Sequence, residues 1–274
     1  MRSILIAGLA IILGACATVP VATEPDAMEL ITLGDQAVLT GNERLALRHY
    51  LAAAKLDQSD YSTLYKIGAL QKRRGNAVAA THAFELALDL NPDDVASLDS
   101  LAVLRIAQGE FEESAELLDR FEAVAPESWR APYLRGLLAM EKGDFGRAEY
   151  QLTIALGRSP SNPEILIRRG EAHLMNNRLF EAEGDLHAAR KVPLYQRQAD
   201  QQLGILYLKK KDYASALEAL MRTATKSTAL TNVGQAAVMH GNVDDAVFYL
   251  REAMRESPTY NAVAADALQE LGQE

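Results

Sequence analysis

The sequence lacks most of the residue patterns on which disulfide-rich folds, metal centres and membrane-spanning helices depend. Its 274 residues include a single cysteine and a single tryptophan. One cysteine excludes both an internal disulfide framework and a cysteine zinc cluster. The longest apolar run, from Ile4 to Leu13, is too short to span a bilayer well. With 49% hydrophobic and 24% charged residues, the chain nevertheless has the composition of a folded protein with its own core.

The chain has fewer basic than acidic residues. The chain has 28 Lys and Arg against 37 Asp and Glu, a formal net charge of −9. An acidic balance argues against a nucleic-acid partner and against a polybasic contact with a membrane surface. It says little about which proteins bind.

Patterns that carry catalysis or metal binding are also missing. There is no glycine-rich phosphate loop, nucleophile elbow or zincin pattern, and the five histidines are scattered without pairing at i, i+4. They are His49, His82, His173, His187 and His240. Acidic pairs such as Glu112-Glu113 lie where a helix is expected to begin, and there they favour the positive end of the helix dipole. We expect no metal, no cofactor and no catalytic residues, although an enzyme with an unrecognised site stays an alternative.

The N-terminus has the layout of an export signal, with Arg2 before the apolar run and small residues after it. The stretch Leu13-Gly14-Ala15-Cys16 resembles the lipobox of bacterial lipoproteins. That resemblance implies cleavage of a signal peptide, residues 1–15, and acylation of Cys16, which would anchor the chain in a membrane through its acyl chains. The alternative is an ordinary secretory signal followed by a chance cysteine.

The segment after Cys16 is short and contains two prolines in ATVPVATEPD, so residues 16–26 are expected to form a lipidated flexible tether. Ala17 stands where, in the enterobacterial sorting rule, an aspartate would retain the lipoprotein in the inner membrane. We therefore expect a lipid-anchored protein on the periplasmic face of the outer membrane.

A repeat organises the rest of the chain. Gly41, Gly75, Gly109 and Gly143 are spaced 34 residues apart, and Asn177 and Lys211 follow in the same phase. A period of this length indicates a stacked-repeat architecture. The expected copies are residues 27–60, 61–94, 95–128, 129–162, 163–196, 197–226 and 227–260, with a capping helix at 261–274. Copy six is four residues short, so we expect an irregularity between Thr223 and Leu230.

Each copy reads as two amphipathic helices joined by a tight turn. The turn glycine suits a left-handed residue just past a helix end, for which Asn177 is the next best choice. At Lys211 we expect strain or a different turn. A second glycine lies seven residues before the turn, as at Gly68, where it allows a close helix approach. Prolines such as Pro92 follow the second helices, because the residue before a proline disfavours helix.

Over residues 27–260 this pattern resembles the tetratricopeptide repeat family, although the usual first-helix tryptophan is missing and arginines, Arg135 and Arg169, precede two of the close-packing glycines. The resemblance implies an all-α fold, an α-solenoid of about seven helix hairpins plus the capping helix. We interpret both arginines as packing residues whose stems cover apolar surface.

In that family the first helix of each repeat lines a partner-binding groove, chiefly through its second, fifth, ninth, twelfth and thirteenth positions, and the resemblance carries this role to certain residues here. They are Tyr65, Lys72, Arg73, Arg130, Tyr133, Leu137, Met140, Ile167, Glu171, Leu174, Met175, Ile205, Leu208, Lys209, Gln235, Val238 and Met239. Most positions beyond the second copy are apolar, which favours a groove for an extended segment or helix of another protein, with methionine adding adaptability. The alternative is that these residues pack against their own neighbouring helices.

Together, lipobox, tether and repeats resemble the assembly lipoproteins of tight-adherence (Flp-type) and type IV pili. The resemblance implies a non-enzymatic scaffold that helps secretin or other pilus proteins assemble at the outer membrane. An adaptor for peptidoglycan enzymes or for outer-membrane β-barrel assembly is the alternative, because repeats alone do not fix partners.

Overall fold

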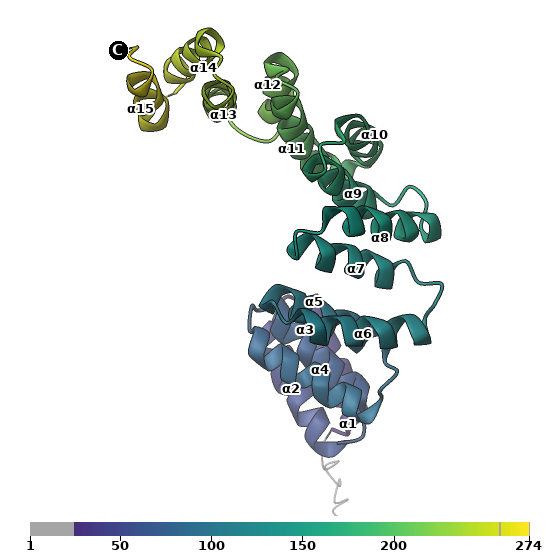
Figure 1. The fold of residues 1–274 in the computed structure, drawn as a ribbon. Helices are drawn as coiled ribbons and strands as arrows, with labels where there is room; N and C mark the ends of the chain where they lie inside the picture. The colour runs from purple at the N-terminus through teal and green to yellow at the C-terminus, as the bar shows by residue number, and fades with distance from the viewer. Residues whose placement is uncertain (1–24, 258, 274) are drawn as a thin grey trace, which may run out of the picture. The chain divides into compact units, whose positions relative to one another are not determined.

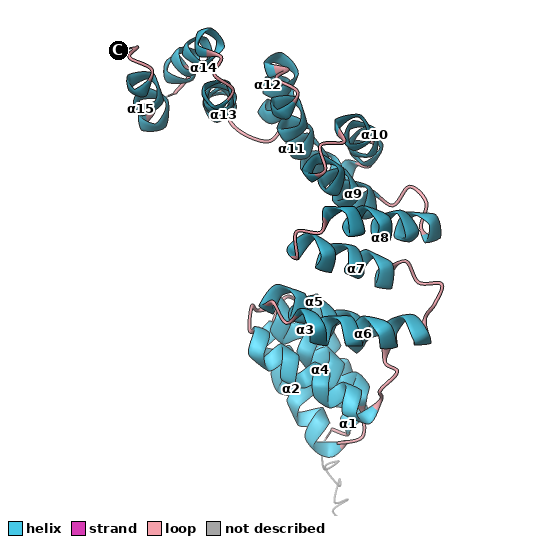
Figure 2. Ribbon diagram, viewed as in Figure 1, coloured by secondary structure: helices cyan, strands magenta, loops and turns pink. Residues whose placement is uncertain are grey.

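The computed structural model describes residues 25–257 and 259–273, and in these residues it contains helices and no strands (Figures 1 and 2). The helices are α1 (Ala27–Leu39), α2 (Glu43–Leu56), α3 (Tyr61–Arg73), α4 (Ala77–Leu90), α5 (Val95–Gln108), α6 (Phe111–Val124), α7 (Arg130–Glu141), α8 (Phe145–Arg158), α9 (Pro163–Met175), α10 (Leu179–Arg190), α11 (Pro193–Lys209), α12 (Tyr213–Met221), α13 (Lys226–Met239), α14 (Val243–Arg255) and α15 (Ala262–Glu270). Odd-numbered helices up to α13 are the first helices of the copies. The all-α solenoid of about seven hairpins is confirmed.

The chain divides after Ser59 into two compact units. The described part of the first unit is the hairpin of α1 and α2. Asn42 caps α2 by accepting a hydrogen bond from the Leu45 backbone N–H, and the Tyr50 hydroxyl donates to Asp35 Oδ1 at 2.6 Å across the hairpin.

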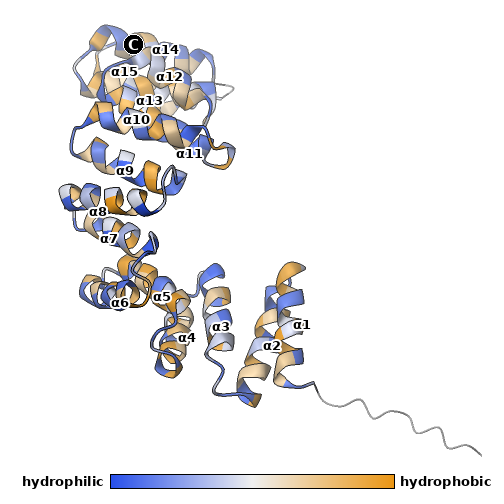
Figure 3. Cartoon of the chain, turned by 90° about the vertical axis from the view of Figure 1, so that its right-hand side faces the viewer, coloured by the Kyte–Doolittle hydropathy of each residue, from blue (hydrophilic) through white to orange (hydrophobic). Residues whose placement is uncertain are grey.

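The second unit contains α3 to α15. Each first helix packs against its own second helix, and each second helix packs against the helix that follows it in the next copy. The helices carry apolar and polar stretches side by side (Figure 3), and the apolar faces form cores such as the one around Phe84, Leu118 and Leu152.

The turns between paired helices share one geometry. Gly75 has φ +76°, and the residue after it donates its backbone N–H to the carbonyl of Gln71 at 2.9 Å. Lys211 adopts the same left-handed conformation, φ +60°, and Asp212 N–H likewise donates to Tyr207 O at 2.9 Å. The turn is therefore unchanged and the lysine takes the strain, about 1 kcal/mol or more for a residue with a Cβ.

The glycine seven residues before each turn makes room for a particular side chain. A Cβ added to Gly68 would lie 2.6 Å from the Phe84 ring, and one added to Gly136 would lie 2.7 Å from Leu152 Cγ. The close contact between the two helices of a hairpin is thus made by this glycine and the large residue sixteen positions later in the same hairpin. Ala102 is the exception and is fully buried.

Copy six differs from the other copies at both ends. α11 begins at Pro193, four residues before the expected start, because proline fits the first turn of a helix. α12 ends at Met221 after nine residues, and the Leu220 carbonyl then accepts from the Thr223 and Ala224 N–H groups. The irregularity therefore falls between α12 and α13, while α13 itself is a regular helix of 14 residues.

The last helix covers the end of the second unit. Ala264 and Leu268 of α15 are buried in a cluster with Leu230, Leu250 and Ala253. Apolar residues of the final hairpin are therefore shielded from water, as a capping helix should do.

Candidate functional site

The predicted groove residues all lie on first helices of the second unit, and we call them the first-helix row. The structure divides them by exposure. Tyr133, Ile167 and Leu174 are buried; Tyr65, Lys72, Arg130, Leu137, Met140, Glu171, Leu208 and Val238 are half-buried; Arg73, Met175, Ile205, Lys209, Gln235 and Met239 are exposed. Three residues of the row are packed inside the fold, as the alternative interpretation expected. Tyr133 is 3% exposed, Ile167 1% and Leu174 4%.

An ion pair connects the row across copies three and four. Arg130 donates from Nε to Asp99 Oδ1 at 2.7 Å and from a terminal nitrogen to Oδ2 at 2.9 Å, a bidentate geometry. Its guanidinium carbon also lies 5.1 Å from the Trp129 ring centroid and 5.4 Å from that of Tyr133. Arg130 is therefore held on both sides, which fixes α7 against α5.

Lys72 of α3 faces the same ion pair. Burial lowers the pKa of its ammonium group, the negative charge of Asp99 opposes that effect, and Arg130 adds to it. Because Arg130 already occupies both Asp99 oxygens, Lys72 lies beside this pair as a half-buried cation.

The connection continues into copies five and six. Burial, together with a hydrogen bond to the Glu164 carboxylate, raises the pKa of the Tyr133 hydroxyl. Arg168 donates to Glu171 Oε2 at 2.8 Å, and Gln202 of α11 donates to the other Glu171 oxygen at 2.9 Å. We call Asp99, Arg130, Glu164, Arg168, Glu171 and Gln202 the polar ladder, since they link α5, α7, α9 and α11 in sequence.

Lys209 also stabilises the packing of α11 against α9. Its Nζ donates to the backbone carbonyl of Leu174 at 2.6 Å, near the C-terminal end of α9, where a cation favours the helix dipole. The side chains of the row left for a partner are therefore mainly Met175, Ile205, Gln235 and Met239, of which Met239 is 86% exposed.

Sequence reasoning missed four members of the polar ladder: Asp99, Glu164, Arg168 and Gln202. A signal existed for two of them. Asp99 occupies the fifth and Glu164 the second position of its copy, the positions used to choose Tyr65 and Arg130. Arg168 and Gln202 occupy the sixth position, which the groove pattern does not include.

One histidine lies in a charged cluster away from the row. His173 is 5% exposed, with Nδ1 3.3 Å from Glu149 Oε2 and Nε2 3.6 Å from Asp185 Oδ2. Burial lowers the pKa of His173 more than the two carboxylates raise it. Arg169 forms a bidentate pair with Asp185, both distances 2.7 Å, so its guanidinium is ion-paired. These groups join α8, α9 and α10 and have a structural role.

The predicted signal peptide and the predicted acylation of Cys16 both depend on the N-terminal segment. Cys16 and the lipobox lie outside the described residues. Within the described part, no helix is long and apolar enough to cross a bilayer, and no group of three or more His, Cys, Asp and Glu side chains could hold a metal ion.

Comparison with curated proteins finds relatives that match only part of this chain. The chain is 32% identical over 133 residues to the "Protein CTR9 homolog" of Arabidopsis thaliana, covering 48% of this chain and 12% of that protein. It is 22% identical over 196 residues to "BBSome complex member BBS4" of Bos taurus, covering 67% and 35%. The chain thus spans roughly a third or less of the relatives' length.

Solved structures share the fold. A tetratricopeptide repeat protein from Parabacteroides merdae superposes with a TM-score of 0.65 at 19% identity, covering 89% of this chain and 97% of the other. PilF of Pseudomonas aeruginosa gives 0.59 at 17% identity, covering 78% and 98%. At these identities the likeness concerns the fold alone.

The sequence profile described as "Tetratricopeptide repeat" matches residues 100–163, 133–195 and 202–261, more than half of the chain. The match agrees with the turn spacing and with the glycine and large-residue pairs inside each hairpin. The chain therefore belongs to the tetratricopeptide repeat family.

Proposed function

We propose that this protein is a non-enzymatic scaffold, anchored by lipid at Cys16 on the periplasmic face of the outer membrane, that binds a segment of a secretin or another pilus assembly protein. The observation that carries the binding role is the first-helix row, where exposed apolar side chains lie beside a fixed polar ladder. Tetratricopeptide repeats are suited to holding protein segments. The fold shared with PilF and the lipobox support the choice of partner.

The row predicts where a partner makes contact. A photo-crosslinking amino acid at Met175 or Met239 should capture a secretin or another pilus protein in cells, because both side chains are exposed on first helices. The same probe at Phe180, which is 85% exposed on the second helix α10, should not. The captured protein is identified by mass spectrometry.

The result also separates the alternatives. A peptidoglycan enzyme or a β-barrel assembly protein captured at Met239 would replace the pilus assignment. Equal capture at Phe180 and Met239 would contradict binding through the row. Tyr133→Ala is a poor test, because removing a buried side chain opens a cavity that costs about 3–5 kcal/mol by itself.

Anchoring through Cys16 has a separate test. Cys16→Ser should abolish acyl labelling and release the protein into the soluble periplasmic fraction, since a hydroxyl does not replace the thiol in lipid attachment. Fractionation followed by immunoblotting measures this. Continued membrane association of the variant would refute anchoring through Cys16. It would not bear on partner binding through the first-helix row.

A further inference from the structure

The outer face of α2, in the first unit, carries all the lysine and arginine side chains of its hairpin. Arg44, Arg48 and Lys55 are exposed, and Leu51, which is 45% exposed, lies among them. At 100° per residue these four positions fall within about 60° around the helix, on the side opposite its buried residues. We call these four residues the basic stripe.

No carboxylate of the hairpin shares the stripe. Glu43, the one acid on α2, points about 100° away from Arg44 around the helix and has no i, i+3 or i, i+4 spacing to a stripe residue. Asp57, beyond the end of α2, accepts hydrogen bonds from the backbone N–H and the hydroxyl of Ser59 at 2.9 and 2.7 Å. The other three carboxylates belong to α1 and its N-cap. Among the described residues, the three stripe cations have no ion-pair or hydrogen-bond partner for their side chains.

The other copies show that the fold does not require cations at these positions. The same four positions hold Val78, His82, Glu85 and Asp89 in copy two and Glu112, Glu116, Asp119 and Ala123 in copy three. No other copy has more than two Lys or Arg residues there. The stripe is therefore a property of copy one, the copy that follows the N-terminal segment, and helix packing does not explain it.

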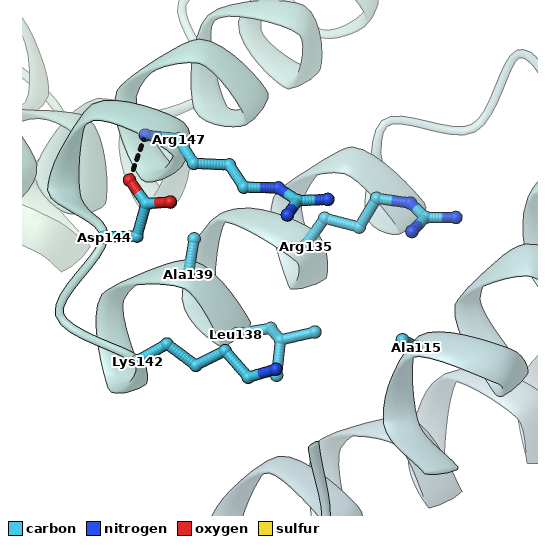
Figure 4. Close-up of a pocket in the computed structure, with 7 residues that line it drawn as sticks. All are labelled: Ala115, Arg135, Leu138, Ala139, Lys142, Asp144 and Arg147. Carbon is cyan, nitrogen blue, oxygen red and sulfur yellow. Dashed lines mark hydrogen bonds between the residues drawn. The ribbon is translucent and has the colours of Figure 1, made fainter. Parts of the chain in front are cut away.

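A cluster of cations in the second unit is different, because carboxylates balance it. At the cleft between α6, α7 and α8, Arg135 pairs with Asp119 and Lys142 with Glu112, and Asp144 lies in the lining (Figure 4). Such a cluster has little net charge to offer a ligand. The basic stripe presents three charges of one sign to solvent.

The start of the stripe borders a shallow hollow in the first unit. The hollow is lined by Gly41, Asn42, Arg44, Leu45 and Arg48. The positive end of the α2 dipole lies at the same place and adds to the charge of the two guanidinium groups. This combination suits one phosphodiester group.

The N-terminal segment would keep this hairpin close to a membrane. Ten residues separate Cys16 from Ala27, and ten residues extend at most about 35 Å. Helix α1 has 13 residues and is therefore about 20 Å long, so either end of the hairpin can reach the surface in which Cys16 is held. Tethering also raises the effective concentration of the stripe at that surface, so a contact that is weak for a free protein suffices.

We propose that the basic stripe contacts the anionic phospholipid headgroups of the membrane in which Cys16 is anchored. Arg44 and Arg48 pair with lipid phosphates, Lys55 adds a third positive charge, and Leu51 lies at the level of the headgroups. The contact rests on the proposed anchoring and gives the first unit a second attachment. The net charge of −9 does not prevent it, because charges farther than about 10 Å from the surface are largely screened at about 0.1 M salt.

The test uses the chain from Cys16 to Glu274, purified without acyl chains, which keeps every described residue. It is mixed with vesicles of phosphatidylcholine, with or without about 30% phosphatidylglycerol as the anionic lipid, and flotation at increasing lipid concentration gives the partition coefficient. Each Lys or Arg near an anionic surface contributes about a fivefold gain. The anionic vesicles should therefore bind the chain roughly a hundredfold more strongly, and about 1 M salt should remove the difference.

Paired variants locate the contact. Arg44→Gln combined with Arg48→Gln should lower partitioning into the anionic vesicles by about 25-fold. The matched control is Arg251→Gln combined with Arg255→Gln, the same charge change at exposed positions of α14, where Arg255 pairs with Glu252. The control should change partitioning by less than about twofold. Equal binding to the two kinds of vesicle, or an equal loss in the two variants, overturns the proposal.

An acidic protein segment is the competing occupant of the stripe. An oligoglutamate peptide that binds the unaltered chain but not the Arg44→Gln, Arg48→Gln variant, without any binding to anionic vesicles, would overturn the proposal in favour of such a segment. The vesicle assay is independent of acylation. Its failure leaves the Cys16→Ser test to judge anchoring, and a failure of anchoring in cells leaves the vesicle result standing.

Discussion

Replacing Gly68 by alanine should destabilise the second hairpin by about 2 kcal/mol, within the usual range for overpacking a core. The added Cβ would lie 2.6 Å from one edge atom of the Phe84 ring and 2.7 Å from another. Phe84 is fully buried, so the ring cannot swing away without opening the core around it. Hydrogen exchange of α3 and α4 measures the effect locally, which suits a repeat array in which unfolding is not all-or-none.

A matched control separates the clash from the general effect of alanine in a helix. A Cβ at Gly157, inside α8, meets nothing within 4 Å, so Gly157→Ala should stabilise by about 0.5–1 kcal/mol through the lower entropy of the unfolded chain. Gly136→Ala should cost less than Gly68→Ala, because Leu152 has rotatable bonds and copy three already accepts Ala102 there. Similar protection in the Gly68→Ala and Gly157→Ala variants would refute the pairing of Gly68 with Phe84.

The fold could be predicted from the sequence because its determinants recur. A turn at Gly75 and a small residue at Ala80 each return in almost every copy, and a local rule repeated along the chain specifies a stacked array. Copy six was less predictable, because Pro193 can either end one helix or begin the next. The sequence alone does not decide between these two roles.

The sequence proposed positions for the site, but it did not indicate the contacts between their side chains. Family positions identified Arg130, but its partner Asp99 is 31 residues away in the chain, and nothing local indicates that pairing. The same positions identified Tyr133 and Ile167 as groove residues, although neighbouring copies bury both. Exposure at a helix face depends on how successive copies pack, which a single-copy pattern does not contain.

Copy six also predicts a large effect at a buried carboxylate. The Asp200 side chain is 2% exposed, with Oδ1 2.6 Å from Arg190 Nε and 3.3 Å from a terminal nitrogen of Arg222. Arg222 follows the last residue of the short helix α12. Asp200 therefore ties the end of α12 to α10 and α11 at the place where four residues are missing.

Asp200→Ala should destabilise the protein by about 2–3 kcal/mol. Removing one member of a buried pair usually costs about 3–5 kcal/mol, and the arginines here, 30% and 37% exposed, recover part of this by hydration. Asp266→Ala, at an exposed position of α15, should change stability by less than about 0.5 kcal/mol. Hydrogen exchange measures the loss of free energy, which should be concentrated in α11 and α12. Loss of protection spread evenly over the second unit, or an Asp200→Ala variant as stable as Asp266→Ala, would show that α12 is held by its apolar contacts alone.

Arg222→Met then separates the two arginines, because it removes the tie to α12 while Arg190 still neutralises the Asp200 carboxylate.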